Sequence, residues 1–121
     1  MASLFEATAG KLIGPTTGGT VTQATSKATG VTLNTASGQI TMDDAALAAA
    51  AEVSFTVTNS EIAATDVVLL NHGSAGTAGA YLVQANTIAA GSFAITVANL
   101  SAGSLGEAIV LNFVALKGAS S

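Results

Sequence analysis

The sequence predicts an all-β fold, a single β-sandwich of jelly-roll or Greek-key type with about eight strands and an extended N-terminal arm. Three observations carry this prediction. Apolar residues alternate with threonine, serine or asparagine along most of the chain, which is the period-2 pattern of strands with one buried face. Turn signals rich in glycine, serine and alanine separate these runs at the spacing of roughly 8–12 residues that is typical of sandwiches and barrels. A longer connection, at residues 43–52, would let the chain cross between sheets.

The expected strands follow one another with short breaks. They cover residues 19–24, 30–34, 37–42, 52–60, 65–73, 79–88, 91–100 and 107–118. The clearest alternation is in EVSFTVTNS, where valine and phenylalanine point to one face and serine and threonine to the other. Phe55, Phe93 and Phe113 each lie in the middle of an alternating strand, and we expect all three in the core. The sequence has no Asn-Gly or Asp-Gly pair of the kind that makes tight hairpins, which argues against a simple meander.

Two segments depart from simple alternation. Val67 to Leu70 are apolar on both faces, which predicts a central strand or one covered on both sides. Residues 43–52 are rich in alanine, and Asp43 would be a suitable helix N-cap. Because ten residues are marginal for an isolated helix, we expect a loop with one or two helical turns that crosses between the sheets.

The domain organisation is simple. Residues 20–118 are expected to form the sandwich, residues 1–19 an extended arm, and residues 119–121 a short C-terminal tail. Glycine and proline are frequent in the arm, which argues against a helix or a long strand there.

Five residues of the arm are candidates for binding a partner. They are two apolar pairs and one lysine, namely Leu4, Phe5, Lys11, Leu12 and Ile13. Chain termini are usually loose unless contacts hold them, so apolar residues on the arm suggest that a partner surface binds it. The alternative is an N-terminus that is simply disordered.

The composition excludes several classes of function. Charged residues make up 8% of the 121-residue chain, against about 25% in an average soluble protein. Three lysines and no arginine cannot form the basic groove that nucleic acid requires. No apolar run reaches the length of about 18 residues that a membrane helix needs, and the N-terminus does not resemble a signal peptide. The absence of cysteine excludes disulfides and thiolate metal sites and fits synthesis in a reducing cytoplasm.

No catalytic, metal or cofactor site is expected. His72 is the single histidine, and without a nucleophile elbow we expect it to bond to the backbone of a loop. Asp43 and Asp44 lack the spacing of a calcium loop, and the other carboxylates lie beside turns or strand ends. The glycine-rich HGSAGTAGA lacks the lysine and the helix of a phosphate-binding loop. The protein is therefore not expected to be an enzyme.

The remaining feature is the surface itself. Threonine, alanine and glycine form a pleated face that can pack against another protein without removing water from charges. A soluble chain that is half apolar and poor in charge is prone to associate. We therefore expect an oligomer whose surface is largely an interface.

These residues resemble a known family. The run TVTQATSKATGVTLN, the ending AIVLNF and the β-rich stretch between them, about residues 19–118, are similar to small structural proteins of tailed bacteriophages. Such proteins are head decoration (cement) proteins or head-fibre proteins. The resemblance implies a homotrimer that binds the major capsid protein on the outer surface of the virion and bridges neighbouring capsomers. The arm would then be mobile in the free protein and ordered against capsid protein or a neighbouring subunit.

Two alternatives remain open. One is a head-fibre or tail-fibre domain that binds a host receptor, although the chain lacks the repeats of a fibre shaft. The other is a carbohydrate-binding jelly roll. Sugar sites usually stack an aromatic ring on the sugar, and this chain has no tryptophan and a single tyrosine, Tyr81.

Overall fold

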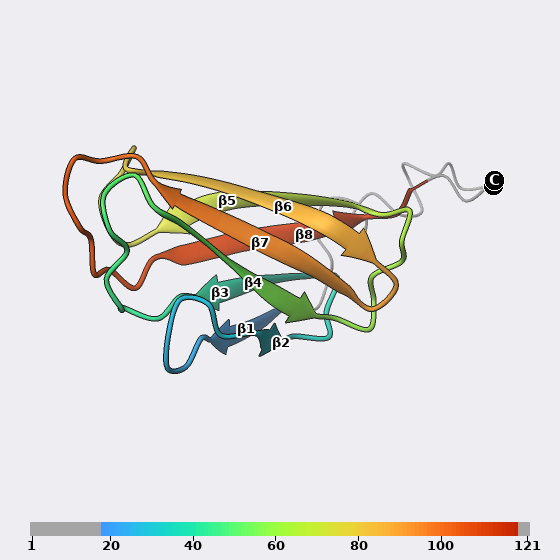
Figure 1. The fold of residues 1–121 in the computed structure, drawn as a ribbon. Coiled ribbons are helices and arrows are strands. Elements are labelled where there is room, and N and C mark those ends of the chain that lie inside the picture. The colour runs from blue at the N-terminus through green and yellow to red at the C-terminus, as the bar shows by residue number, and fades with distance from the viewer. Residues whose placement is uncertain (1–17, 119–121) are drawn as a thin grey trace, which may run out of the picture.

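The computed structural model describes residues 18–118, which form eight strands and contain no helix (Figure 1). The strands are β1 (Gly19–Thr22), β2 (Val31–Thr32), β3 (Ser37–Thr41), β4 (Glu52–Thr58), β5 (Val67–Ser74), β6 (Tyr81–Ala89), β7 (Ser92–Asn99) and β8 (Val110–Leu116). Each corresponds to one of the eight segments predicted from alternation, and β5 and β6 each end one residue beyond the predicted segment. This part of the chain accordingly has no helix that could cross a membrane.

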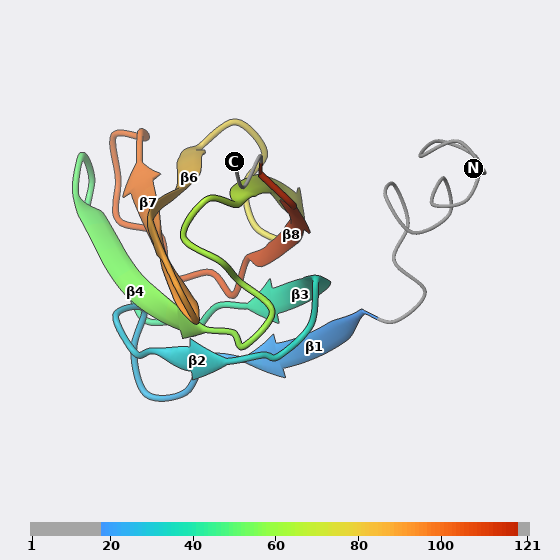
Figure 2. The ribbon, with the colours of Figure 1, turned by 90° about the vertical axis from the view of Figure 1, so that its right-hand side faces the viewer.

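The strands form two four-stranded mixed sheets. Sheet A has the order β1-β3-β8-β5 and sheet B the order β2-β4-β7-β6. Figure 2 shows β4, β7 and β6 on one side of the molecule and β3 and β8 on the other. The pairs β1/β3 and β2/β4 are parallel and all other pairs are antiparallel. The chain changes sheet at every connection except β6–β7, a tight hairpin in which Gly91 has a φ of 85°.

The direction of the strands divides the connections between two ends of the fold. Odd-numbered strands run away from the end at which the chain enters β1, and even-numbered strands run back to it. We call this the terminal end, because β1 begins there at Gly19 and β8 finishes there at Leu116. The opposite, distal end carries residues 23–30, 42–51, 75–80 and 100–109.

The core lies between the inward faces of both sheets. Phe55, Phe93 and Phe113 are 3%, 1% and 4% exposed, and the rings of Phe93 and Phe113 have centroids 5.4 Å apart. Gly19 and Gly38 are paired inward-facing residues of β1 and β3, where an added Cβ would come within 2.7 Å of Leu33. Their missing side chains make room for Leu33 at this edge of the core.

The structure corrects the expected helical turns in residues 43–52. The segment does cross from sheet A to sheet B, but as a loop without helix, with one turn at Ala49 and Ala50 in which the N–H of Ala51 donates to the carbonyl of Ala48 at 3.1 Å. The Oδ1 of Asp43 accepts a hydrogen bond from the N–H of Ala45, and Leu47 forms an antiparallel bridge with Leu105. Asn99 donates from its side chain to the carbonyl of Leu47. The segment is not helical because its backbone groups bond to the β7–β8 connection and to β7, a tertiary effect that outweighs alanine's helix propensity.

The structure also corrects the prediction of a central β5. This strand lies at the edge of sheet A. Its inward residues Val68 and Leu70 pack against the core, whereas the outward Val67 and Leu69 are 50% and 51% exposed. The alternative of a central strand was wrong, because a second apolar face can also belong to an edge strand. The other alternative, a strand covered on both sides, stays a prediction, since the outer face is uncovered only with respect to the described part of the chain.

Candidate contact surfaces

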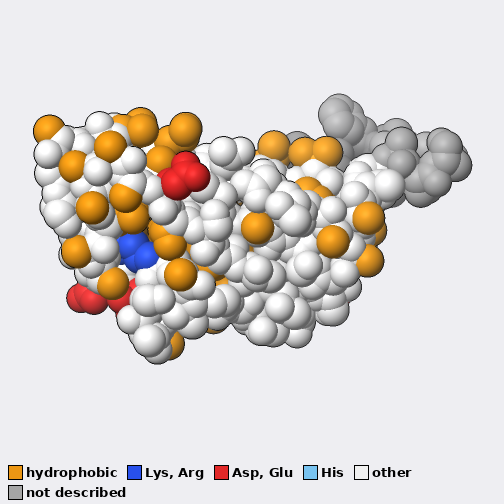
Figure 3. Space-filling view, in the orientation of Figure 1, with side chains coloured by type: hydrophobic (Ala, Val, Ile, Leu, Met, Phe, Trp, Pro, Cys, Tyr) orange, Lys and Arg blue, Asp and Glu red, His pale blue; other side chains and the backbone are white. Residues whose placement is uncertain are grey.

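The charged residues of the described chain gather at the two ends of the fold. Lys27, Asp43, Asp44 and Glu107 lie in distal connections. Glu61, Asp66 and Lys117 lie at the terminal end, and Glu52 begins β4 at the distal end. Figure 3 looks onto the side that carries β4 and β7, where the red and blue side chains gather at the end with the distal loops. Both sheets therefore present outer faces almost without charge.

The outer face of sheet B is built from small polar residues. Its members are Glu52, at the distal edge, and Thr32, Ser54, Thr56, Thr58, Leu82, Gln84, Asn86, Ser92, Ala94, Thr96 and Ala98. Thr96 hydrogen-bonds with Ser54 at 2.7 Å and accepts from the Nδ2 of Asn86 at 3.0 Å. These cross-strand bonds hold the hydroxyl and amide groups close to the sheet. Apart from Glu52 at its distal edge, this face can therefore pack against a partner without desolvating a charge.

The outer face of sheet A is more apolar near the terminal end. The register pairs Val67 with Leu116 and Leu69 with Val114, which places these four side chains together. We call Val67, Leu69, Val114 and Leu116 the apolar patch. The register also places Thr20, Gln39, Asn112 and Asn71 in an adjacent row across the sheet.

Two shallow depressions lie along these rows. One, of about 370 Å³, is lined by Gly18, Gly19, Thr20, Ser37, Gly38, Gln39 and Phe113. The other, of about 290 Å³, is lined by Leu69, Leu70, Asn71, Asn112, Phe113 and Val114. Because Ser37 pairs with Val114 and Gln39 with Asn112, the depressions are neighbours. Together they form a trough that crosses sheet A from β1 to β5.

Asn112 gives this trough an unused hydrogen-bond acceptor. Its Oδ1 is buried and accepts no hydrogen bond from the residues that the structure describes. The side chain lies over Gly73, where an added Cβ would come within 2.2 Å of Nδ2. A buried carbonyl oxygen without a donor is costly, so a donor placed in the trough would be favourable.

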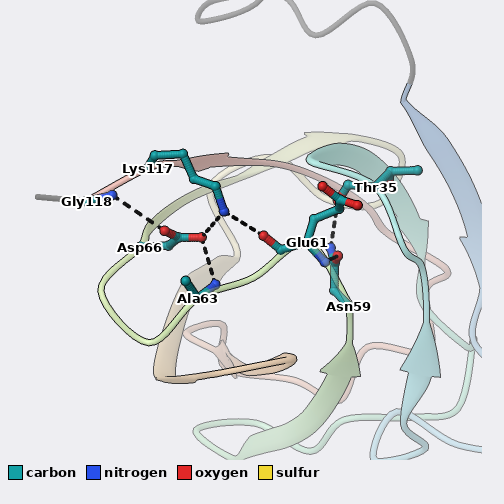
Figure 4. Close-up of polar contacts among 7 residues, drawn as sticks. All are labelled: Thr35, Asn59, Glu61, Ala63, Asp66, Lys117 and Gly118. Carbon is teal, nitrogen blue, oxygen red and sulfur yellow. Dashed lines mark hydrogen bonds and ion pairs between the residues drawn. The ribbon is translucent and has the colours of Figure 1, made fainter. Parts of the chain in front are cut away.

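A buried carboxylate ties the chain together at the terminal end (Figure 4). The side chain of Asp66 is 2% exposed, and its Oδ2 accepts hydrogen bonds from the Nζ of Lys117 at 2.8 Å and from the N–H of Ala63 at 2.9 Å. Its Oδ1 accepts a longer bond from the N–H of Gly118 at 3.5 Å. The Lys117 Nζ also donates to the carbonyl of Glu61 at 2.7 Å. This cluster fastens the end of β8 to the β4–β5 connection.

The cluster lowers the pKa of Asp66. Burial by itself would raise this pKa, but the hydrogen bonds from Lys117, Ala63 and Gly118 and the charge of Lys117 outweigh burial. Because the pKa is lower in the folded than in the unfolded chain, the ionised carboxylate stabilises the fold at neutral pH. That contribution is lost as the pH falls through the folded-state pKa.

Asp66→Asn should therefore lower the free energy of unfolding at pH 7, and the difference from the unmodified protein should shrink as the pH falls below about 4. Urea unfolding at pH 7 and pH 3 measures the difference. Glu52→Gln, at an exposed carboxylate, is the control and should change stability little at either pH. A difference for Asp66→Asn that is the same at both pH values would contradict the assigned role.

A second polar cluster lies at the distal end. Glu107 accepts hydrogen bonds from the N–H of Thr77 at 2.9 Å, the Thr77 hydroxyl at 2.8 Å and the Tyr81 hydroxyl at 2.7 Å. The bond from Tyr81 and those from Thr77 lower the pKa of Glu107, while burial and Glu107 raise the pKa of Tyr81. His72 contacts Tyr81 edge-on, and its Nε2 lies 2.6 Å from the carbonyl oxygen of Ala75, the backbone contact expected for it. These groups hold the glycine-rich connection at residues 75–80 in place, and their polar atoms have hydrogen-bond partners within the cluster.

Lys27 is a feature that sequence reasoning missed. It is 3% exposed, and its Nζ donates to the backbone carbonyls of Asp43 and Glu107, the latter at 2.7 Å. Burial lowers the pKa of Lys27, opposed by the nearby charges of Asp43, Asp44 and Glu107. The residue thus joins three distal connections. Its position between Ser26 and Ala28 in the sequence gives no signal of this burial.

The predicted site residues fall into two groups. Phe55, Phe93 and Phe113 are all in the core. Leu4, Phe5, Lys11, Leu12 and Ile13 lie outside the described residues. Residues 18–118 contain no group of three or more histidine, cysteine, aspartate or glutamate residues placed to hold a metal. The apolar patch was not predicted as a surface, although the two-faced apolar pattern of residues 67–70 was its signal.

Comparisons with family models, with curated proteins and with solved structures find no match to this chain. Its function is therefore inferred from the surfaces and contacts described above.

Proposed function

We propose that this protein is a structural protein of a tailed-bacteriophage virion, a capsid decoration (cement) protein that acts as a homotrimer and has no enzymatic activity. It binds the major capsid protein on the outer capsid surface and bridges neighbouring capsomers, after synthesis in the cytoplasm of the host bacterium. The observation that supports this best is that the charged side chains lie at the two ends of the fold and are almost absent from the outer faces of the sheets. The outer faces of both sheets offer area for contact, whereas the charged residues serve to tie loops together at the ends.

The topology fits this proposal. We class the fold as a β-sandwich of jelly-roll or Greek-key type, because six of its seven connections pass between the two sheets. The two parallel pairs depart from a purely antiparallel sandwich. β1 and β8 both meet the chain termini at one end, so an arm and a tail would leave the body on the same side.

The alternative functions have less support. A sugar would need an aromatic ring free to stack on it, but Tyr81 is half-buried and its hydroxyl donates to Glu107. A receptor-binding fibre domain would use the same uncharged faces, but the sequence shows none of the internal repeats of a fibre shaft. Sedimentation of the purified protein with undecorated capsids tests the proposal directly, because a decoration protein pellets with shells and a soluble sugar-binding module does not.

We expect the isolated protein to be a trimer that resists salt. Its contacts would come from threonine, alanine and branched aliphatic side chains, and the charge-poor faces cannot supply an ion-pair network. Light scattering at micromolar concentration, in low salt and in about 1 M NaCl, measures the mass. A monomer in low salt, or dissociation on adding salt, would be evidence against this assembly.

A further inference from the structure

The trough across sheet A begins where the chain enters the described structure. Gly18 and Gly19 line its first depression, and Leu69 and Val114 of the apolar patch line its second. Val67 and Leu69 are half exposed, so the patch is uncovered in the described part of the chain. Asn112 also lines the second depression, and its buried Oδ1 has no donor among residues 18–118.

The chain that precedes Gly18 has the length and the residues to fill this trough. β1 and β5 are three strand spacings apart, about 14 Å at about 4.8 Å each. An extended chain advances about 3.3 Å per residue, so the five residues from Gly18 back to Ile13 span about 17 Å. Leu12 and Ile13 would therefore reach the apolar patch, and Gly18 allows the change of direction needed where the chain leaves the line of β1.

We propose that residues 12–17 fold back across the trough of their own chain and place Leu12 and Ile13 on the apolar patch. The backbone N–H groups of the crossing segment supply a donor for Asn112. The segment is uncharged from Leu12 to Thr17, which matches the uncharged floor and walls of the trough. Leu4 and Phe5, further from the body, stay free to contact another protein.

The chain's own segment is the occupant because it is already attached at one end of the trough. A second copy or an unrelated protein would have to lose translational freedom to bind there, whereas a tethered segment acts at a high effective concentration. This inference does not depend on a role in the virion. The whole arm was expected to be mobile in the free protein. If residues 12–17 dock in the trough, only residues 1–11 are expected to be mobile.

Tryptic cleavage after Lys11 tests the docking, because it requires Leu12 and its neighbours to leave the trough. We expect cleavage in the full-length protein to be at least about tenfold slower than in a synthetic peptide of residues 1–18. Leu69→Thr/Val114→Thr should bring the rate close to that of the peptide. Leu82→Thr, which changes a similarly exposed leucine on sheet B, is the matched control and should leave the protection intact. Circular dichroism checks that all variants are folded.

Two outcomes would overturn the proposal. One is cleavage of the full-length protein at the rate of the peptide. The other is equal protection in the full-length protein and in Leu69→Thr/Val114→Thr, which would place the segment elsewhere.

A disulfide distinguishes the chain's own segment from that of a second copy. The protein has no cysteine, so Ile13→Cys/Leu69→Cys creates a single possible pair in each chain. Mild oxidation should give an intrachain bond, seen as a faster-migrating monomer on a non-reducing gel. Ile13→Cys/Leu82→Cys should not form it, because Leu82 is on the other sheet. Disulfide-linked dimers of the first variant, or the absence of any bond, would contradict docking within one chain.

Discussion

Phe93→Ala should lower the free energy of unfolding by about 3–5 kcal/mol per chain. Phe93 is 1% exposed, lies opposite Val57 in the register of sheet B and contacts Phe113 of sheet A. The substitution therefore opens a cavity where the two sheets meet, and a small domain has a total stability of only about 5–15 kcal/mol. Chemical denaturation at one fixed protein concentration measures the loss.

Leu82→Ala is the matched control for this substitution. Leu82 is 54% exposed on the outer face of sheet B, so its truncation should cost less than about 1 kcal/mol. A cost below about 1 kcal/mol for Phe93→Ala itself would mean that β7 does not bury this ring.

Deletion of residues 2–18 should weaken binding to undecorated capsids by about 100-fold or more while the fold and the trimer persist. The deletion removes Leu4 and Phe5, the two large apolar side chains that remain free for a partner, and each contributes up to about 1.5–3 kcal/mol where a partner buries it fully. The body keeps its core, because every core residue lies within residues 31–113. Sedimentation with shells gives the affinity, and light scattering gives the oligomeric state.

Smaller changes separate the contributions of the arm. Leu4→Ser/Phe5→Ser should weaken capsid binding without altering the protection of Lys11 from trypsin. Removal of residues 119–121, which follow the terminal end of β8, is a control that should leave binding unchanged. If the protein without residues 2–18 decorates shells as tightly as the full-length protein, the arm is not the attachment site.

The eight strands could be predicted because alternation is a local signal with a direct physical cause. In EVSFTVTNS each apolar residue faces the core in the structure, and Phe55 and Val57 are almost fully buried. Sheet order was beyond prediction, because it depends on which strands meet across connections that change sheet. Val67 to Leu70 illustrate this limit, since the same four residues suit a central strand and an edge strand with an apolar outer face.

Loop structure was harder to predict because distant residues determine it. The alanine-rich residues 43–52 form no helix because Leu105 and Asn99 supply hydrogen bonds from far along the chain. Lys27 is buried because carbonyl groups at Asp43 and Glu107 converge on its Nζ. Leu69 and Val114 lie side by side on the outer face of sheet A. The sequence alone does not show this, because it depends on the register between β5 and β8.

We propose that these uncharged faces serve assembly into a virion. The amount of the protein in purified virions tests this role most directly. Quantitative mass spectrometry of gradient-purified particles gives the molar ratio of this chain to the major capsid protein. A decoration protein should be present in a copy number comparable to that of the major capsid protein. Its absence from virions, or its presence in only the few copies expected of a tail-fibre domain, would contradict the proposed function.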